Sequence, residues 1–454
     1  MFRTALSTSS WTLPAHMSML TGLLPEVHGV QKERKVLDAR RALVQEILHE
    51  GGFRTAGVVS AAFLDGRYGF ERGFESYENL WTSESELFAG VPKGLPLVAL
   101  LAQLQEQVDR KADQDRTGPK VVEAANRWLD EHASESFFLF VHFWEPHADY
   151  IAPSPYDRFF VPPQYAGTLS MKNFFYNDAI NPNMAPEDLA YLLSQYDGEI
   201  AFTDFLIGKI LDRLDDLGIA DETLVVVTSD HGEEFFEHGQ KGHRTALYRE
   251  SVRVPLILRG PGVVPNPAGI SGPIVSLIDL APTILSAVGM EPGPEMMGRD
   301  LGPLLAGRPG GQTTTLRLDG PDDGTRPGDT IAGDGTDEAP DNLLASPDQL
   351  AVCQLVLGDE SGEACPQFAV RSDRWKAIID CRDSCEIYDL LRDPSEQEPI
   401  SQSNEAEAVQ FLRQCRRMRT EVRRVARSIP HEGTKLLSID PKLEEELRSL
   451  GYMK

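Results

Sequence analysis

Residues 223–234 read Thr-Leu-Val-Val-Val-Thr-Ser-Asp-His-Gly-Glu-Glu, so that an apolar run ends abruptly at Asp230 and His231. A continuous run of aliphatic residues is typical of a strand buried on both faces of a sheet. Comparable runs predict further strands at residues 55–60, 137–143 and 255–258. Apolar residues with helical spacing predict helices at residues 41–49, 121–131, 200–217 and 277–288. This alternation predicts an α/β sandwich, in which helices cover both faces of a mostly parallel central sheet.

The composition of the chain changes near residue 307. Residues 308–348 are acidic, rich in Gly, Pro and Asp, and almost free of apolar side chains, which predicts a flexible, dispensable insertion. Residues 1–307 are predicted to form the large α/β domain. Residues 349–454 are predicted to form a smaller α+β subdomain. Its expected elements are short antiparallel strands at 368–370, 376–379 and 386–388, and a basic helix at 410–427.

The chain has 454 residues and a net charge of −26. Nucleic-acid backbones and anionic membranes need clustered Lys and Arg, so this charge argues against both as partners. A small anionic substrate stays compatible, because a local cationic pocket can hold it. The longest apolar run, Leu95–Leu104, is shorter than the roughly 18 to 20 residues of a membrane helix and predicts a core helix. No secretory signal peptide is expected in the chain as written.

The five cysteines all lie late in the chain, at Cys353, Cys365, Cys381, Cys385 and Cys415. Cys381 and Cys385 are close enough to bridge a tight hairpin, and free thiols are the alternative. An odd number leaves at least one cysteine unpaired. None lies near a histidine cluster at zinc-like spacing. The cellular compartment and the oligomeric state therefore stay open.

Asp230 and His231 follow the strand predicted at 223–228. Ligands bind at the carboxyl ends of strands in open α/β sheets, and a carboxylate beside an imidazole is a ready pair of metal ligands. The alternative is that Asp230 caps a helix and His231 is an ordinary surface residue. His238 and His243 follow within thirteen residues of Asp230, and this cluster favours a functional site.

Two further segments carry residues suited to catalysis. Thr12 precedes Pro14 and a helical stretch, so its hydroxyl is expected at a helix N-terminus. Amide dipoles at that end of a helix stabilise an attacking alkoxide. His16 lies one helical turn after Thr12 and could face the same pocket. An ordinary N-cap is the alternative. His147 follows the strand predicted at 137–143, where it could protonate a leaving group; a loop histidine bonded to the backbone is the alternative.

Together these segments resemble the sulfatase family of the alkaline phosphatase superfamily. Residues 12–16, Thr-Leu-Pro-Ala-His, match its nucleophile motif of Cys or Ser, any residue, Pro, a small residue and Arg. Residues 230–233, Asp-His-Gly-Glu, match its second metal motif, and Pro146-His147 matches its Pro-His loop. The other matching landmarks are Thr21-Gly22, His28-Gly29-Val30, residues 196–200, 237–239, 247–248, 253–256, 279–283, 388–390, 393–394 and 450–452.

The resemblance implies a metal-dependent hydrolase of sulfate or phosphate esters, with residues 1–307 as its catalytic domain. Thr12 would attack the sulfur or phosphorus atom, and Asp230 and His231 would hold one divalent ion, Ca²⁺ first, with Mg²⁺, Mn²⁺ or Zn²⁺ as alternatives. His147, His243 and His16 would act on the ester. The alternative functions are a phosphodiesterase or phosphotransferase that uses Thr12, and a non-catalytic remnant of the family.

The chain departs from the family pattern at two places. Family sulfatases convert the Cys or Ser of the motif into formylglycine, and Thr12 is not expected to undergo that conversion. The family also begins with a strand that ends in paired metal-binding aspartates, whereas residues 1–11 contain no Asp or Glu. That first strand is therefore expected to be absent from this chain, and an upstream export signal with it, because relatives are often periplasmic, extracellular or membrane-anchored.

Overall fold

The computed structural model describes residues 1–454 apart from 82–116, 271–272, 308–349, 359–363, 401–404 and 429–454. The predicted acidic insertion and the Leu95–Leu104 helix lie outside the described residues, so both stay predictions. By its contacts the chain divides into two compact units, each assembled from separate segments. Unit 1 comprises Met1–Val44, Val225–Gly232 and His243–Lys435, and unit 2 comprises Gln45–Leu224, Glu233–Gly242 and Leu436–Lys454. The predicted domain boundaries at 307 and 349 also stay predictions.

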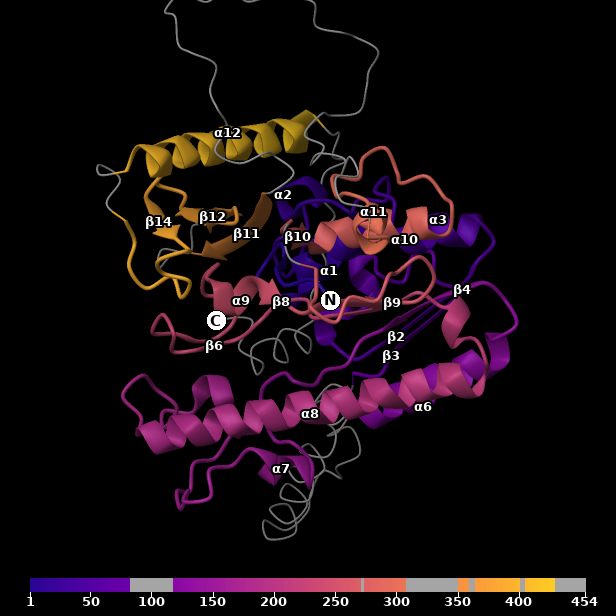
Figure 1. Ribbon diagram of the computed structural model, residues 1–454, viewed down its shortest axis with the longest axis horizontal. Coiled ribbons are helices and arrows are strands. Elements are labelled where there is room, and N and C mark those ends of the chain that lie inside the picture. The colour runs from indigo at the N-terminus through magenta and orange to yellow at the C-terminus, as the bar shows by residue number, and fades with distance from the viewer. Residues whose placement is uncertain (82–116, 271–272, 308–349, 359–363, 401–404, 429–454) are drawn as a thin grey trace, which may run out of the picture. The chain divides into compact units, whose positions relative to one another are not determined.

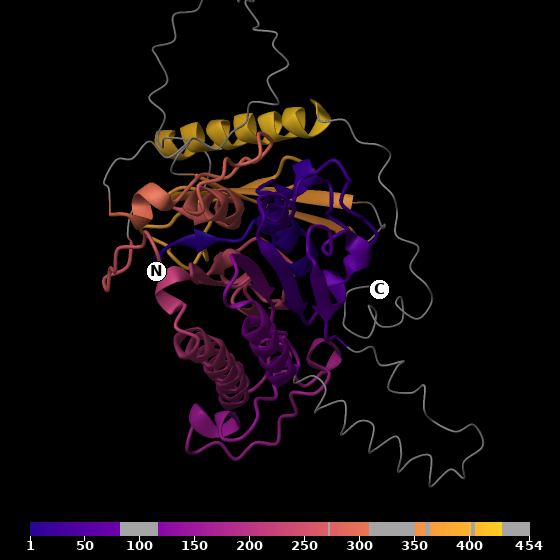
Figure 2. The same cartoon turned by 90° about the vertical axis from the view of Figure 1, so that its right-hand side faces the viewer.

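Unit 2 is built on a parallel three-stranded sheet. Its order is β3 (Ser76–Asn79), β2 (Arg54–Val59) and β4 (Phe137–Val141), with β2 in the centre. Helix α6 (Gly118–His132) packs Val121 and Ala124 against this sheet, because its apolar residues recur on one face. Helix α8 (Pro186–Asp216) lies alongside α6, as two perpendicular views show (Figures 1 and 2).

The remaining elements of unit 2 are short. They are the strands β6 (Glu234–Phe235) and β7 (Lys241–Gly242), the helix α7 (Tyr156–Phe159) and the 3₁₀ helices Ala62–Leu64, Gly66–Tyr68, Phe174–Tyr176 and Ala220–Glu222. Helix α3 (Val44–Glu50) begins at the last residue of the first segment of unit 1 and continues into unit 2.

Unit 1 contains a second set of central strands. Strand β1 (Ala5–Leu6) lies between a parallel neighbour, β10 (Val275–Ser276), and an antiparallel neighbour, β8 (Arg253–Val254). Strand β5 (Val225–Thr228), which precedes Asp230, pairs antiparallel with β9 (Leu256–Arg259). The helices of this region are α1 (Thr12–Thr21), α2 (Pro25–His28), α9 (Arg249–Val252), the 3₁₀ helix Leu277–Asp279, α10 (Leu280–Ala287) and α11 (Gly302–Leu305).

The C-terminal part of unit 1 is a four-stranded antiparallel sheet covered on one face by a long helix (Figure 1). The strands follow one another along the chain, and the core between sheet and helix includes Phe368, Trp375, Phe411 and Val422. The elements are β11 (Ala351–Gly358), β12 (Ala364–Arg371), β13 (Trp375–Ile379), β14 (Cys385–Asp389) and α12 (Ala406–Ser428). The α/β class and the small antiparallel C-terminal sheet are thus confirmed.

The cysteine pairing differs from the bridge considered between Cys381 and Cys385. Cys381 is bonded to Cys365, with a Cα–Cα distance of 5.0 Å, while Cys353, Cys385 and Cys415 are not in disulfides. The register of the sheet explains this result. Because Phe368 pairs with Ile379, the chain on either side brings Cys365 of β12 next to Cys381, just beyond β13.

Two other sequence predictions are corrected. The helix predicted at 200–217 is a longer helix, α8, that begins at Pro186, because proline suits the first turn of a helix. Gly198 lies within α8, where a Cβ would come 2.7 Å from the Tyr156 carbonyl oxygen. Strands β4 and β5 are half-buried rather than buried on both faces. In the part of the chain that the structure describes, β4 is an edge strand and β5 pairs with one strand, which leaves both more accessible than central strands.

Candidate active site

Thr12 is the first residue of α1, as predicted from its spacing to Pro14. Helix α1 is buried along its whole length, and Gly22 ends it in the left-handed conformation, with φ of 67°. Thr12 itself is 6% exposed. A hydroxyl in the first turn of a helix lies in the positive field of the helix dipole, which favours negative charge on an attacking oxygen and on an anionic ester.

Asp230 and His231 lie in the loop after β5. Gly232 fixes this loop against α9: its N–H donates to the Ser251 carbonyl at 2.9 Å, and a Cβ at position 232 would lie 2.0 Å from the Glu250 carbonyl oxygen. Only glycine therefore allows this close approach of the two backbones. Gly232, which follows the end of β5 closely, thus holds Asp230 and His231 in place.

The structure brings Thr12, Asp230 and His231 together. Thr12 Oγ1 lies 3.4 Å from His231 Nε2, and Asp230 Oδ2 lies 3.5 Å from the same nitrogen. His231 Nδ1 lies 2.8 Å from the Gly232 carbonyl oxygen, which can only accept a hydrogen bond. In neutral His231, Nδ1 therefore carries the proton, and the lone pair of Nε2 faces Thr12 and Asp230.

His16 lies one helical turn after Thr12 and turns back toward it. Its Nδ1 lies 2.9 Å from the Thr12 carbonyl oxygen and 3.4 Å from Asp230 Oδ2. The side chain is 3% exposed, and this burial lowers the pKa of His16 although Asp230 opposes the shift. His16 Nδ1 therefore lies between the Thr12 carbonyl and the Asp230 carboxylate.

His243 joins the same group of side chains. Its ring lies 4.4 Å from the ring of His231, and the residue is 6% exposed. The following residue, Arg244, donates its backbone N–H to the Ser10 carbonyl at 3.0 Å. Residues 243–244 are thus fastened to the segment that precedes Thr12. Five predicted site residues of unit 1 thus lie close together: Thr12, His16, Asp230, His231 and His243.

His147 belongs to unit 2. Its Nδ1 lies 3.0 Å from the Ala148 carbonyl oxygen, and its ring lies 3.9 Å from that of Trp144. It is half-buried in the loop after β4. These contacts fix the orientation of the ring, and the role of His147 toward an ester stays a prediction.

The described residues do not provide a complete set of metal ligands. They contain no group of three or more His, Cys, Asp or Glu side chains arranged to hold an ion. Asp230 and His231 supply one carboxylate and one imidazole, whereas Ca²⁺ takes six to eight oxygen ligands and Zn²⁺ about four donors. The pair can contribute to a metal site but does not constitute one.

Sequence reasoning missed Arg244 and its environment. The guanidinium lies 4.2 Å from the centre of the Trp11 ring, and it forms an ion pair with Glu33. Arg244 has a φ of +67°. The sequence places Arg244 directly after His243 and Trp11 directly before Thr12. Their contact, however, forms only in the folded chain.

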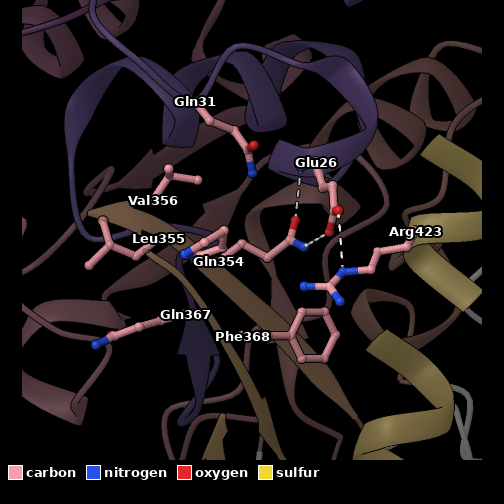
Figure 3. A pocket seen from close by; sticks show the side chains of 9 residues that line it. Glu26, Gln31, Gln354, Leu355, Val356, Gln367, Phe368 and Arg423 are labelled. Atoms are coloured by element: carbon pink, nitrogen blue, oxygen red, sulfur yellow. Dashed lines mark hydrogen bonds and ion pairs between the residues drawn. The ribbon is translucent and has the colours of Figure 1, made fainter. Parts of the chain in front are cut away.

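A separate cavity lies in the C-terminal part of unit 1. It has about 310 Å³ of empty space, part of it open to solvent, between α2, β11, β12 and α12. Figure 3 shows Gln354 and Arg423 converging on Glu26. Gln354 accepts from the Glu26 N–H at 3.0 Å and donates to its carboxylate at 3.1 Å, while Arg423 lies 3.6 Å from that carboxylate. None of the predicted site residues lines this cavity.

Comparison with known proteins identifies the family to which a chain with this fold belongs. The family model named Sulfatase matches residues 1–290, so the chain belongs to the sulfatase family. Arylsulfatase K of Xenopus laevis is 27% identical over 331 residues, which are 67% of this chain and 59% of that protein. The chain thus spans less than two thirds of the length of such curated relatives.

Solved structures share the fold. Phosphonate monoester hydrolase of Agrobacterium radiobacter superposes with a TM-score of 0.68 at 21% identity, covering 93% of this chain and 88% of that one. BT4656, solved in complex with its substrate D-glucosamine-2-N,6-O-disulfate, superposes with a TM-score of 0.65 at 16% identity, covering 94% and 90% of the two chains. Among the described residues, no helix is long and apolar enough to span a membrane.

Proposed function

We propose that this protein hydrolyses sulfate or phosphate esters with Thr12 as the nucleophile. The observation that carries the proposal is the 3.4 Å approach of the Thr12 hydroxyl, in the first turn of α1, to Nε2 of His231. Membership of the sulfatase family supports the reaction class. The substrate would be a small anionic ester, in keeping with the sulfated sugar bound by BT4656.

The proposed reaction has two stages. Thr12 Oγ1 bonds to sulfur or phosphorus as its hydroxyl proton passes to water, and the bond from that atom to the ester oxygen breaks. The alcohol leaves with a proton, for which His243, packed against His231, is the proposed donor within unit 1. Water then cleaves the Thr12 ester and regenerates the hydroxyl. His16 holds the first turn of α1 through the Thr12 carbonyl.

A divalent ion is proposed as cofactor because the family to which the chain belongs generally uses one. Asp230 and His231 would contribute to its binding, and Ca²⁺ is proposed first, with Mg²⁺, Mn²⁺ and Zn²⁺ as the other candidates. When bound, such an ion would lower the negative charge on the ester oxygens. Since the described residues offer only two donors, we expect weak binding in a calorimetric titration. Tight binding that survives Asp230→Asn would show that other carboxylates form the metal site.

The test uses Thr12→Ala and Thr12→Ser with 4-nitrophenyl sulfate, 4-nitrophenyl phosphate and bis(4-nitrophenyl) phosphate. We expect Thr12→Ala to abolish turnover of every ester and Thr12→Ser to retain part of it. Thr21→Ala, at the other end of α1, removes the Thr21 hydrogen bond to the Met17 carbonyl and serves as the control. The preferred ester distinguishes a sulfatase from a phosphodiesterase.

The second candidate function is a non-catalytic binding module. The incomplete donor set around Asp230 and His231 favours it. It would be supported if the intact protein turned over none of the three esters with any of the four ions. It would be excluded if turnover by the intact protein disappeared in Thr12→Ala while the melting temperature stayed unchanged.

A further inference from the structure

The segment around Arg244 has an unusual backbone. Its φ of +67° lies in the left-handed region, which side chains other than Gly, Asn and Asp rarely adopt. The Arg244 N–H donates to the Ser10 carbonyl, so this conformation is held directly beside the residues that lead into Thr12. Backbone strain of this kind persists where the surrounding structure enforces it, often at functional sites.

The side chain of Arg244 is fixed on two sides. Its guanidinium stacks over Trp11, which is 1% exposed and directly precedes Thr12. Glu33 pairs with one of its terminal nitrogens. The side chain of Arg244 remains 20% exposed, so a small solute can still reach it. A guanidinium presents its N–H donors in a rigid plane, which suits the oxygens of an oxyanion.

The other basic side chains described near Thr12 are the histidines His16, His231 and His243, whereas a guanidinium keeps its positive charge at every ordinary pH. The Asp230 carboxylate lies among these histidines. An anionic ester that approached Thr12 would meet that carboxylate, and a permanent cation such as Arg244 is suited to offset its charge.

We propose that Arg244 is a specificity-determining residue that binds the non-bridging oxygens of the anionic ester beside Thr12. The inference rests on the proposed function for its substrate class. Trp11 pre-organises the guanidinium, which reduces the entropy lost when it binds an oxyanion in a bidentate manner. Glu33 also competes with the substrate for the same cation, so the ion pair sets how strongly the site prefers dianions over monoanions.

The experiment measures binding of inorganic phosphate by calorimetry to the full chain and to Arg244→Ala, Arg244→Lys and Glu33→Gln. We expect Arg244→Ala to weaken binding about 10- to 100-fold, because charge-assisted hydrogen bonds are lost. Arg244→Lys should recover only part of the affinity, since lysine lacks the planar fork. Glu33→Gln should tighten phosphate binding by removing the competing carboxylate. Arg40→Ala, which breaks an exposed ion pair with Asp38 in the same unit, is the control.

Turnover is measured in parallel so that the two proposals are tested separately. Phosphate binding that depends on Arg244 without any ester turnover would support this inference and refute the proposed hydrolase. Unchanged phosphate binding in a folded Arg244→Ala, or no binding by the unmodified chain, would overturn the inference. If Arg244→Ala does not fold, Glu33→Gln decides: weaker binding in that variant would mean that the ion pair only secures the loop.

Discussion

Unit 1 contains two groups of polar side chains that differ in how their hydrogen bonds are arranged. In the cavity lined by Glu26, Gln354 and Arg423, the three side chains bond mainly to one another (Figure 3). Around Thr12, the donors and acceptors are instead oriented so that a hydroxyl, a carboxylate and an imidazole lone pair lie together. The first arrangement stabilises the fold, and the second is suited to bind and transform a ligand.

The two groups also differ in their connection to the chain. Glu26 lies at the start of α2, Gln354 in β11 and Arg423 in α12, so their contacts join the C-terminal sheet to the N-terminal helices. Thr12 and Asp230 come from the ends of one helix and one strand. Removing a side chain should therefore reduce stability in the first group and activity in the second.

The largest effect is expected for Asp230→Asn. Asparagine keeps the shape of the side chain but removes the charge near His16 and His231, so kcat/KM should fall about 1,000-fold. The urea midpoint of unfolding should change little. Asp38→Asn, at an exposed ion pair, is the control. A large loss of stability in Asp230→Asn would place Asp230 with the structural group and contradict the comparison.

Gln354→Ala should give the opposite result. The side chain is buried and makes two hydrogen bonds to Glu26, so its loss leaves a backbone N–H and a carboxylate oxygen without these bonds. The free energy of unfolding should fall by about 2 kcal/mol while ester turnover is retained. Gln31→Ala, in the same cavity, serves as the matched control. A selective loss of activity in Gln354→Ala would show that the two groups are coupled.

His243 offers a finer test, because it packs against His231 without being one of the two proposed metal ligands. His243→Lys places a proton donor near the ester and should lower kcat/KM by only about tenfold, whereas His243→Ala should lose more. Metal content, measured by elemental analysis, should be equal in both variants and the unmodified protein. Loss of metal in both would identify His243 as a ligand.

The parts of the site that the sequence predicted are those set by local pattern. The spacing of Thr12 to Pro14 placed the hydroxyl in the first turn of α1, and the apolar run before Asp230 placed the carboxylate at the end of β5. The α/β class was predicted from the alternation of strand-like apolar runs with segments of helical spacing. His28, a family landmark, is structural: burial lowers its pKa to about 3, and its Nδ1 accepts from the Val30 N–H at 3.1 Å.

The parts that the sequence did not predict depend on tertiary register. Cys365 meets Cys381 because of the pairing of β12 with β13, which cysteine spacing alone does not reveal. Arg244 meets Trp11 only when the segment after His243 returns to the start of α1. His16 aligned with the arginine of the family motif, but burial lowers its pKa, although Asp230 and the bond to the Thr12 carbonyl oppose that shift.

The smallest expected effect concerns the charge of Glu26. Burial raises the pKa of Glu26 above its ordinary value of 4.5, although Arg423 and Gln354 oppose the shift. A carboxyl group with a raised pKa in the folded state contributes most to stability below its ordinary pKa, and that contribution is lost as the pH rises through the folded value. Glu26→Gln has no charge to desolvate and should therefore unfold at slightly higher urea than the unmodified protein at about pH 7. Because Glu26 is partly exposed, the gain should stay below about 1 kcal/mol.

The pH dependence of this Glu26→Gln effect separates it from a simple change in packing. At about pH 4 the unmodified Glu26 is largely protonated, so the two proteins should unfold at nearly the same urea concentration, whereas at neutral pH the curves should separate. Ester turnover should be equal at every pH, because Glu26 bonds to Gln354 and pairs with Arg423 rather than with Thr12 or its neighbours. A Glu26→Gln variant that was less stable at neutral pH would mean that the Arg423 ion pair outweighs the desolvation of the carboxylate. The structural group would then be held by charge pairing, and Arg423→Met should destabilise the protein by a similar amount.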